Sequence, residues 1–569
     1  MEALVLKDSI ARNWLAALCI CSGRCVLATS NAGGDRESSW GGQFTRSMLE
    51  WLEVPEADWQ DLMDLPFGDA ANDMVLLTLR CKRNDEELFE QQRTMQSKSL
   101  ESVSDPDKLY SGLIFACLGI TTKQLAKIGD SAGDPVSSQS SAHGTDDTAL
   151  LRPFEYDSRS RAAAFVISNW LEMPRQFVCT YEAQIASGLE EAADKARLSN
   201  ASTSALERDS KRKWGWRKYL AAGAGVAVAG TLVGLTAGLA APLMAAGMGA
   251  IGIGGFGFLA TAGGAAMIGS LFGMAGGGLV GKRFNTRLRG IKELYFTQLP
   301  LVSESALRPH SLHATVLVPG FLDPVASQSP FMPVRDIMGL DLGDAYTMYF
   351  ETKELAALQG ALSEFVGSTA KSMALSLVLK QTVLSGLIGA FTWPLALLNL
   401  AKLIDAPWSV GLERAKRAGK LLADILESRA HGKRPVTLVG YSLGALTIFT
   451  CLQQLHRRKA FGIVESAVLL GIPADSTAKE AWSACCRAVS RQVIVGYSQN
   501  DWVLAFLFRA SSLCSNLAGL SGVDEAVLFK DQPLMRRKLV NLDLASIVVQ
   551  HADYLDKIDD ITLEVSRVL

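Results

Sequence analysis

The chain has 569 residues, of which 49% are hydrophobic, and this length is enough for roughly two to four domains and at least one large buried core. The formal net charge of −2 argues against the strongly basic surface that a nucleic-acid-binding protein needs. The ten cysteines have no regular spacing and are expected to be reduced thiols of an intracellular protein, and no metal or organic cofactor is predicted.

The amino-terminal part of the chain is predicted to be mainly helical. Residues 1–129 read as one helical domain, residues 130–150 as a flexible loop rich in Ser, Asp and Gly, and residues 151–213 as a helical segment with a polar linker. The candidate packing anchors of the first domain are Trp14, Trp40, Trp51 and Trp59.

An apolar, glycine-rich block follows at residues 214–290. Its centre, residues 219–281, contains 19 of the chain's 50 glycines and no charged residue, and both flanks are basic. This stretch is long enough for two bilayer crossings, and the basic flanks favour a helical hairpin whose two ends face the cytoplasm. Glycines at every fourth position would let the two helices pack closely. The alternative is a soluble helical hairpin that packs on the rest of the protein.

From residue 311 onward, strand patterns alternate with helix patterns, which indicates a mostly parallel sheet covered by helices on both faces. We therefore predict an α/β domain over residues 291–569. An apolar insertion occupies residues 353–406, and its uncharged stretch 381–401 is either a lid over an acyl pocket or a helix that covers the sheet. The predicted strands are Ala314–Val318, Ala345–Phe350, Pro435–Val439, Glu465–Leu470, Gln492–Tyr497 and Lys538–Leu544.

The motif Gly440-Tyr441-Ser442-Leu443-Gly444 lies between a predicted strand and a predicted helix. In this context Gly-x-Ser-x-Gly forms the nucleophile elbow of α/β-hydrolases, a turn so sharp that the serine backbone is strained. The two glycines are needed because neighbouring chain passes close to the turn. The pattern predicts an α/β-hydrolase domain with Ser442 as nucleophile, and an ordinary glycine-rich turn is the alternative.

A serine nucleophile needs a base within hydrogen-bond reach and an acid that orients the base. In α/β-hydrolases the order along the chain is serine, acid, histidine. Only His456 and His551 follow Ser442, and His456 lies in a basic cluster at a helix end, so His551 is the predicted base. Asp501 follows the end of a strand and is the predicted acid. The alternative, Asp475, is better suited to cap the helix that starts nearby.

Two backbone N–H groups are needed to bind the oxyanion that forms during ester cleavage. The first is predicted at Leu443, directly after the nucleophile. The second is predicted at Phe321 or Leu322, in the loop after strand 314–318, where Gly320 lets the backbone approach closely. An ordinary Pro-Gly turn is the alternative for this loop.

Several segments between residues 214 and 554 have distinctive amino-acid sequences: Gly234–Pro242, Ser270–Gly273, Asp405–Trp408 and Gly432–Ala445. In these segments the chain resembles the transmembrane and coiled-coil domain-containing protein 4 family, an uncharacterised group that is similar to lipases. The resemblance implies an α/β-hydrolase domain, a triad at the serine, aspartate and histidine named above, and membrane association through the glycine-rich block. Such proteins tend to carry Gly-Trp and Trp-Glu where this chain has Gly320-Phe321 and Phe350-Glu351.

The sequence therefore predicts a membrane-associated serine hydrolase that cleaves an ester bond, with a lipid or another acyl ester as substrate. The protein is expected at an intracellular membrane, with its catalytic domain facing the cytoplasm. Two alternatives stay open at this point. One is a non-catalytic membrane scaffold or trafficking adaptor that retains a hydrolase fold, and the other is a soluble esterase with a buried glycine-rich hairpin.

Overall fold

The protein forms two compact units in a computed structural model. One unit contains residues 1–281, 303–312 and 432–434, and the other contains residues 282–302, 313–431 and 435–569. The structure describes residues 40–51, 54, 59, 156–170, 175, 176, 178–183, 185, 186, 290–299, 311–320, 331, 334, 342–364, 408–511, 516–530 and 532–569. The glycine-rich stretch 219–281 and residues 365–406 of the apolar insertion lie outside these ranges.

The second unit is built on a seven-stranded sheet with the strand order β1-β3-β2-β4-β5-β6-β7. β1 pairs antiparallel with β3, and every other pair in this sheet is parallel. All residues of β2, β4 and β5 are buried, as expected for central parallel strands that are covered on both faces. The strands are β1 (Leu294–Gln298), β2 (Ala314–Val318), β3 (Asp344–Phe350), β4 (Val436–Tyr441), β5 (Val464–Leu470), β6 (Val489–Tyr497) and β7 (Leu539–Asp543).

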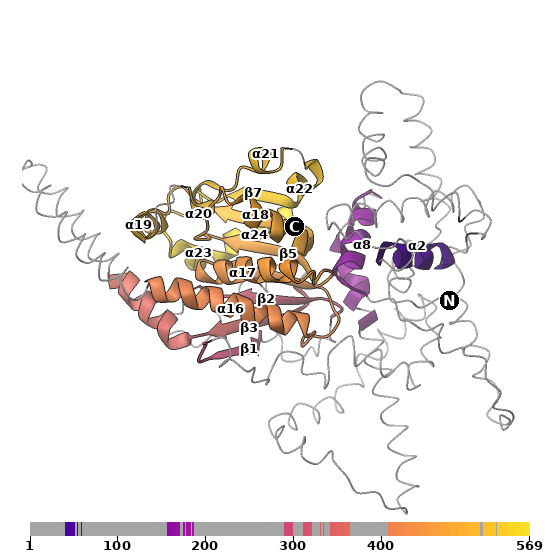
Figure 1. Ribbon diagram of the computed structural model, residues 1–569, viewed down its shortest axis with the longest axis horizontal. Coiled ribbons are helices and arrows are strands. Elements are labelled where there is room, and N and C mark those ends of the chain that lie inside the picture. The colour runs from indigo at the N-terminus through magenta and orange to yellow at the C-terminus, as the bar shows by residue number, and fades with distance from the viewer. Residues whose placement is uncertain are drawn as a thin grey trace, which may run out of the picture. The chain divides into compact units, whose positions relative to one another are not determined.

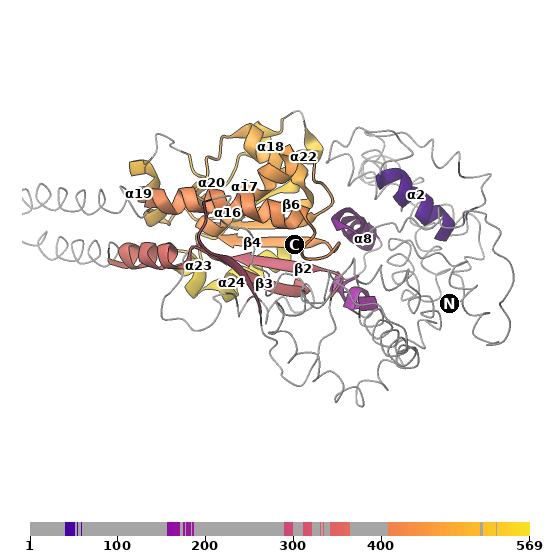
Figure 2. The same cartoon turned by 60° about the horizontal axis from the view of Figure 1, so that its bottom comes forward.

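Helices cover both faces of this sheet (Figure 1). Figure 2 shows α16, α17 and α18 on one side of the strands and α23 and α24 on the other. A further helix spans residues 352–364, after β3. The labelled helices are α16 (Ser409–Glu427), α17 (Leu443–Arg457), α18 (Lys479–Ala488), α19 (Trp502–Ser511), α20 (Ala518–Ser521), α21 (Glu525–Leu528), α22 (Pro533–Lys538), α23 (Asp553–Asp556) and α24 (Ile558–Val568).

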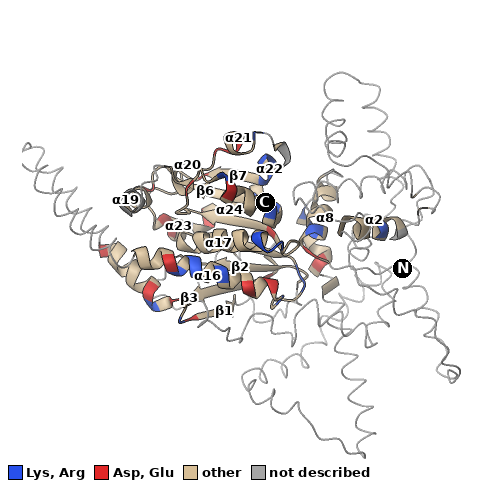
Figure 3. Cartoon of the chain, in the orientation of Figure 1, with Lys and Arg blue, Asp and Glu red and all other residues tan. Residues whose placement is uncertain are grey.

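The helix α16 illustrates why these segments are helical. Ala415, Ala418, Leu422 and Leu426 are buried at spacings of three and four residues, which places them on one helix face. The charged residues of the same helix lie at its exposed and half-buried positions (Figure 3). An apolar stripe of this kind packs on the unit's core while the charged face stays in water.

The predicted mostly parallel α/β architecture is confirmed, with three local corrections. The strand β1 was not predicted, because its short alternating pattern is typical of an edge strand and carries little signal by itself. Lys538 ends α22 and does not start a strand. The sequence pattern predicts one helix over residues 502–517, whereas α19 covers Trp502–Ser511 and Leu517 pairs with Asp475 in an isolated bridge.

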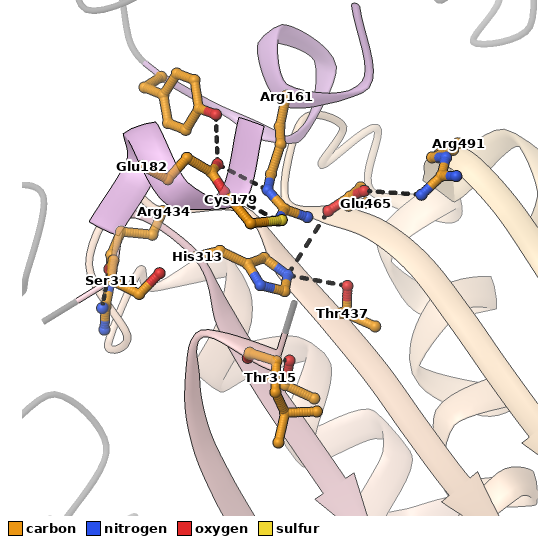
Figure 4. Close-up of polar contacts among 12 residues, drawn as sticks. Arg161, Cys179, Glu182, Ser311, His313, Thr315, Arg434, Thr437, Glu465 and Arg491 are labelled. Carbon is orange, nitrogen blue, oxygen red and sulfur yellow. Dashed lines mark hydrogen bonds and ion pairs between the residues drawn. The ribbon is translucent and has the colours of Figure 1, made fainter. Parts of the chain in front are cut away.

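In the first unit, a buried ion pair holds helical segments together. Arg161 donates from Nε and Nη2 to the two carboxylate oxygens of Glu182, at 2.7 and 3.0 Å, and the Tyr156 hydroxyl donates to the same carboxylate (Figure 4). Both charges are 1% exposed, and burial at this level requires a charge to be paired. The described helices of this unit are α2 (Trp40–Trp51) and α8 (Ser158–Trp170).

A second buried polar cluster lies at the amino-terminal ends of the central strands of the sheet. His313, just before β2, has its Nε2 3.0 Å from Thr437 Oγ1 in β4 and 3.6 Å from Glu465 Oε2 in β5 (Figure 4). Arg491 Nη1, in β6, lies 3.6 Å from the other oxygen of Glu465. These contacts join four neighbouring strands at the amino-terminal edge of the sheet. Open parallel sheets carry their functional groups at the opposite, carboxyl-terminal edge, so this cluster is assigned to the structure of the sheet.

Candidate active site

Ser442 occupies the sharp turn between β4 and α17. Its backbone has φ 52° and ψ −118°, a positive-φ conformation that costs a residue with a side chain on the order of 1–3 kcal/mol. The Ser442 N–H donates to Leu470 O, at the end of β5, at 2.8 Å, and Ser442 O accepts from the N–H of Leu446 at 3.1 Å. Bonds to the sheet and to the helix thus hold the strained residue at the carboxyl end of β4.

Three glycines make room for this turn. A Cβ at Gly440 would lie 2.7 Å from the carbonyl carbon of Gly444, and a Cβ at Gly444 would lie 2.7 Å from the carbonyl carbon of Val318. A Cβ at Gly320, just beyond β2, would lie 2.5 Å from Leu443 N. These distances are well inside van der Waals contact, so each side chain would displace backbone. The chain after β2 therefore packs directly on the nucleophile turn.

His551 and Asp501 reach Ser442 from two other loops, which follow β7 and β6. His551 Nε2 lies 2.8 Å from Ser442 Oγ, and His551 Nδ1 lies 2.5 Å from Asp501 Oδ2. Ser442 and Asp501 expose none of their surface, and His551 exposes 2%. The fold thus brings three residues that are far apart in the sequence into one buried, hydrogen-bonded row.

The carboxylate of Asp501 is oriented by the helix that follows it. Its second oxygen, Oδ1, accepts from the N–H of Leu504 at 3.0 Å, in the first turn of α19. This N–H belongs to the amino terminus of the helix, and its donation fixes the orientation of the carboxylate. An ionised carboxylate that accepts from Nδ1–H of His551 leaves Nε2 free to accept a proton. The row can therefore move a proton from Ser442 to His551.

The two alternative residues lie away from this row. Asp475 Oδ1 accepts from the N–H and from the hydroxyl of Thr477, at 2.8 and 2.7 Å, so this carboxylate stabilises the turn before α18. His456 lies in the last turn of α17, and α17 starts directly after Ser442. At a rise of 1.5 Å per residue, that position is about 20 Å along the helix from the nucleophile. Burial lowers the pKa of His456.

Leu443 is the first residue of α17. The first N–H groups of a helix have no acceptor within the helix, and they carry the positive end of its dipole. The Leu443 N–H thus lies beside the nucleophile with the character that an oxyanion donor needs. Phe321 and Leu322, the predicted second donors, lie outside the described residues. Gly320, which directly precedes them, contacts the backbone of Leu443.

Sequence reasoning missed the side chains that hold the loop between β7 and α23, which carries His551 and is named the base loop here. Ser498 Oγ donates to Val548 O at 2.6 Å, and Asn500 Nδ2 donates to Ala545 O at 2.9 Å. Both donors belong to the loop that ends at Asp501, so the loops that carry Asp501 and His551 are bonded to each other. Proximity to Asp501 was the only sequence signal for these two residues.

Asp553 closes the base loop from its other end. Its Oδ2 accepts from the N–H groups of Val549 and Gln550, at 2.8 and 3.2 Å, and lies 3.3 Å from Lys557 Nζ. Burial raises the pKa of Asp553, but these N–H groups and the ammonium outweigh it, so the pKa lies below that of a free aspartate. The carboxylate therefore stays ionised and keeps the backbone next to His551 in place.

Two curated relatives align with most of this chain. A Caenorhabditis elegans protein named Uncharacterized membrane protein F35D11.3 is 35% identical over 416 residues, which are 73% of this chain and 64% of that protein. A rice protein named Transmembrane and coiled-coil domain-containing protein STS1 is 34% identical over 418 residues, which are 70% of this chain and 59% of that protein. The chain thus matches somewhat less than two thirds of the length of these relatives.

A third relative has a shorter match. The Saccharomyces cerevisiae protein named Probable lipase MIL1 is 43% identical over 170 residues, which are 30% of this chain and 16% of that protein. No solved structure matches the chain significantly. Within the part of the chain that the structure describes, no helix combines the length and the apolar character needed to cross a bilayer.

A family model with the description "Protein of unknown function (DUF726)" matches residues 213–567. The match begins at the glycine-rich block and includes Ser442, Asp501 and His551. The name of the rice relative agrees with the resemblance to transmembrane and coiled-coil domain-containing proteins that the sequence shows. The narrower assignment to the transmembrane and coiled-coil domain-containing protein 4 family stays a prediction. Because the model matches more than half of the chain, the protein belongs to the DUF726 family.

Proposed function

We propose that this protein is a membrane-associated serine hydrolase that cleaves an ester bond of a lipid. One observation carries the proposal: the buried row in which Asp501 Oδ2 lies 2.5 Å from His551 Nδ1 and His551 Nε2 lies 2.8 Å from Ser442 Oγ. The three residues follow β4, β6 and β7 at the carboxyl edge of the sheet, in the chain order serine, acid, histidine. That order and that edge are the ones expected of an α/β-hydrolase.

In the proposed reaction, Ser442 Oγ attacks the ester carbonyl while His551 Nε2 accepts the hydroxyl proton. The charge that develops on the carbonyl oxygen is bound by the N–H of Leu443 and by a second N–H, from Phe321 or Leu322. Protonated His551 then gives its proton to the leaving alcohol, which leaves an acyl group on Ser442. Water activated by His551 cleaves this acyl-enzyme and releases the acid.

Separate observations support the lipid substrate and the membrane. The names of the worm and rice relatives describe membrane or transmembrane proteins, and the yeast relative is named a probable lipase. The uncharged stretch 219–281 is long enough for two crossings, and its basic flanks favour a catalytic unit on the cytoplasmic side. The complete burial of Ser442 suits a substrate whose apolar groups exclude water from the reacting bond.

Labelling with a fluorophosphonate probe tests the proposal. We expect the purified full-length protein, in lipid vesicles or in detergent, to form a covalent adduct, and we expect Ser442→Ala to abolish it. Hydrolysis assays over a panel of lipid esters then identify the head group. If the wild-type protein were labelled in neither medium, the proposal would fail, and a membrane scaffold or trafficking adaptor that keeps the fold without using it would be favoured.

Asp501→Asn and Asp475→Asn are a matched pair for the same assay. Each substitution removes one carboxylate from a loop after a sheet strand and keeps the shape of the side chain. We expect Asp501→Asn to slow labelling by a factor of about 10³–10⁴, because His551 then adopts the wrong tautomer. Asp475→Asn is expected to react like the wild type, since Asp475 bonds to Thr477. Equal rates for the two variants would remove Asp501 from the mechanism.

A further inference from the structure

Two buried tyrosine rings flank the imidazole of His551. Tyr441, the residue before the nucleophile, has its ring centroid 5.4 Å from that of His551, with the planes tilted by 35°. Tyr554, in α23, has its ring centroid 5.8 Å away and meets the imidazole edge-on at 71°. The two tyrosine rings are tilted against each other at 5.6 Å. The imidazole is therefore packed against two rings that the core itself holds in place.

The hydroxyl groups of these two tyrosines differ in their bonding. The Tyr441 hydroxyl donates to the main-chain oxygen of His551 at 3.1 Å. The Tyr554 hydroxyl is also buried, but it has no hydrogen-bond partner among the residues that the structure describes. Tyr441 thus bonds the nucleophile's own strand to the backbone of the base, whereas Tyr554 contributes its ring.

The Tyr441 hydrogen bond completes a closed path of covalent bonds and hydrogen bonds, called the circuit below. The circuit runs from Tyr441 along the backbone to Ser442, across to His551 Nε2, through that residue to its carbonyl oxygen, and back to the Tyr441 hydroxyl. Because the circuit begins and ends on adjacent residues, a shift of the His551 backbone directly changes the distance between Nε2 and Ser442 Oγ. A misplacement of about 1 Å between reacting groups can lower a rate by about a hundredfold.

The Tyr441 hydroxyl keeps its proton throughout the pH range in which a histidine base works. Burial and then the charge of Asp501 raise the pKa of Tyr441 well above that of a free tyrosine. A protonated phenol donates to a carbonyl oxygen, and this carbonyl belongs to the residue whose ring nitrogen has to meet Ser442. The bond thus persists over the pH range in which activity would be measured.

We propose that Tyr441 is a positioning residue, whose hydroxyl holds the main chain of His551 at the place from which Nε2 accepts the Ser442 proton. The inference rests on the proposed serine-hydrolase function and adds to it a residue outside the triad. Tyr441 acts through His551 and needs no contact with the substrate. This role also explains a tyrosine at the second position of the Gly-x-Ser-x-Gly motif, where the turn itself demands only the two glycines.

Tyr441→Phe and Tyr554→Phe are the matched test. Each removes one buried hydroxyl from a ring that packs on the same imidazole, and each keeps the ring. We expect Tyr441→Phe to lower the maximal rate of fluorophosphonate labelling by about tenfold at unchanged probe affinity and at every pH, because the base is displaced. We expect Tyr554→Phe to stay within about twofold of the wild type, because its hydroxyl makes no hydrogen bond to any residue that the structure describes.

Replacement of Tyr441 by p-aminophenylalanine restores a donor at the same ring position, and we expect it to recover most of the rate. All rates are measured on the full-length protein in detergent, well below the melting temperature of each variant. This rescue also keeps the test decisive if Tyr441→Phe is poorly stable.

Each other outcome overturns the positioning role. A wild-type labelling rate in Tyr441→Phe would overturn the positioning role. It would leave the proposed triad unaffected, since labelling would still depend on Ser442. Equal losses in the two phenylalanine variants would assign the effect to ring packing and not to the bond with His551. A lower melting temperature with an unchanged labelling rate would make Tyr441 a residue for stability alone. Absence of labelling in the wild-type protein itself would mean that the proposed function had failed.

Discussion

Lys538 shows how strongly the fold can change the properties of a single residue. Its side chain is 4% exposed, and Nζ donates to Val489 O at 2.7 Å and to Cys486 O at 3.4 Å, at the carboxyl end of α18. Burial lowers its pKa from 10.5 to about 7. The helix-end carbonyls favour the charged form, but they do not replace the water that surrounds a free ammonium group.

We expect the stability of the protein to depend on pH through Lys538. Between the folded-state pKa of about 7 and the unfolded-state pKa near 10.5, the unfolded chain binds more protons, so the free energy of unfolding rises with pH. From about pH 7 to about pH 10 the wild type is expected to gain about 3–4 kcal/mol more than Lys538→Met. Urea unfolding of both proteins at several pH values measures the difference.

The exposed Lys530 provides a control for this experiment. Lys530→Met is expected to keep the wild-type dependence on pH, because its ammonium group stays in water in the folded state. Parallel stability curves for the wild type and Lys538→Met would show that the buried ammonium group is not the source of the effect.

Single residues differ in how far the sequence could predict them. The Gly-x-Ser-x-Gly motif identifies Ser442. The order serine, acid, histidine along the chain then leaves few candidates besides Asp501 and His551. The bond from Tyr441 could not be predicted, because its acceptor lies 110 residues further along the chain and its geometry depends on where the base loop folds back. Lys538 resembled the start of a strand in the sequence. Its burial could not be predicted, because it depends on the carbonyl groups of Cys486 and Val489, which only tertiary packing brings near.

At the scale of elements, the packing of α16 on α17 supports the nucleophile turn from outside. A Cβ at Gly419 in α16 would lie 2.8 Å from Thr450 Cβ and 3.2 Å from Cys451 N in α17. Thr447 Oγ1 donates across the same interface to Ala415 O at 3.2 Å. The two helices approach each other this closely because a glycine lies between them, and Ser442, the proposed nucleophile, directly precedes α17.

Gly419→Ala and Gly360→Ala are expected to change stability in opposite directions. Gly360 lies in the helix 352–364, and a Cβ there would meet no atom within 4 Å, so alanine should stabilise that helix by about 0.5–1 kcal/mol. The same change at Gly419 forces α16 and α17 apart and should cost about 1–3 kcal/mol. Urea unfolding compares the two variants. Stabilisation by both would show that the interface yields without cost.

The central elements could be predicted from sequence and the peripheral ones could not. The strands β2, β4 and β5 are buried on both faces, so their continuous apolar runs are visible without knowledge of the fold. β1 has alternating buried and exposed residues over only five positions, and it is ordered by antiparallel pairing with β3. The short helices α20 and α21, of four residues each, have too few turns to produce a helical period.

At the scale of the whole molecule, the family match spans both the glycine-rich block and the α/β unit, from residue 213 to residue 567. The two parts therefore belong to one family module. The role of residues 1–213 could not be predicted, because their helical patterns indicate packing and carry no catalytic motif.

We expect the full-length protein to stay in the membrane pellet after alkaline carbonate extraction, because two apolar helices of the block 219–281 would span the bilayer. Deletion of residues 219–281 is expected to release the protein into the supernatant. Ser442→Ala is the control and should remain in the pellet, since it changes chemistry and not attachment. Release of the full-length protein would instead favour a soluble hairpin packed on the α/β unit.

The zero exposure of Ser442 has a kinetic consequence. A reagent reacts only with molecules whose site has opened, so the observed rate is the intrinsic rate multiplied by the open fraction. If about one molecule in a hundred were open, the protein would react about a hundredfold more slowly than its chemistry allows. Because phosphonylation is irreversible, the adduct still accumulates with time, and a compound that raises the open fraction would act as an activator without touching the triad.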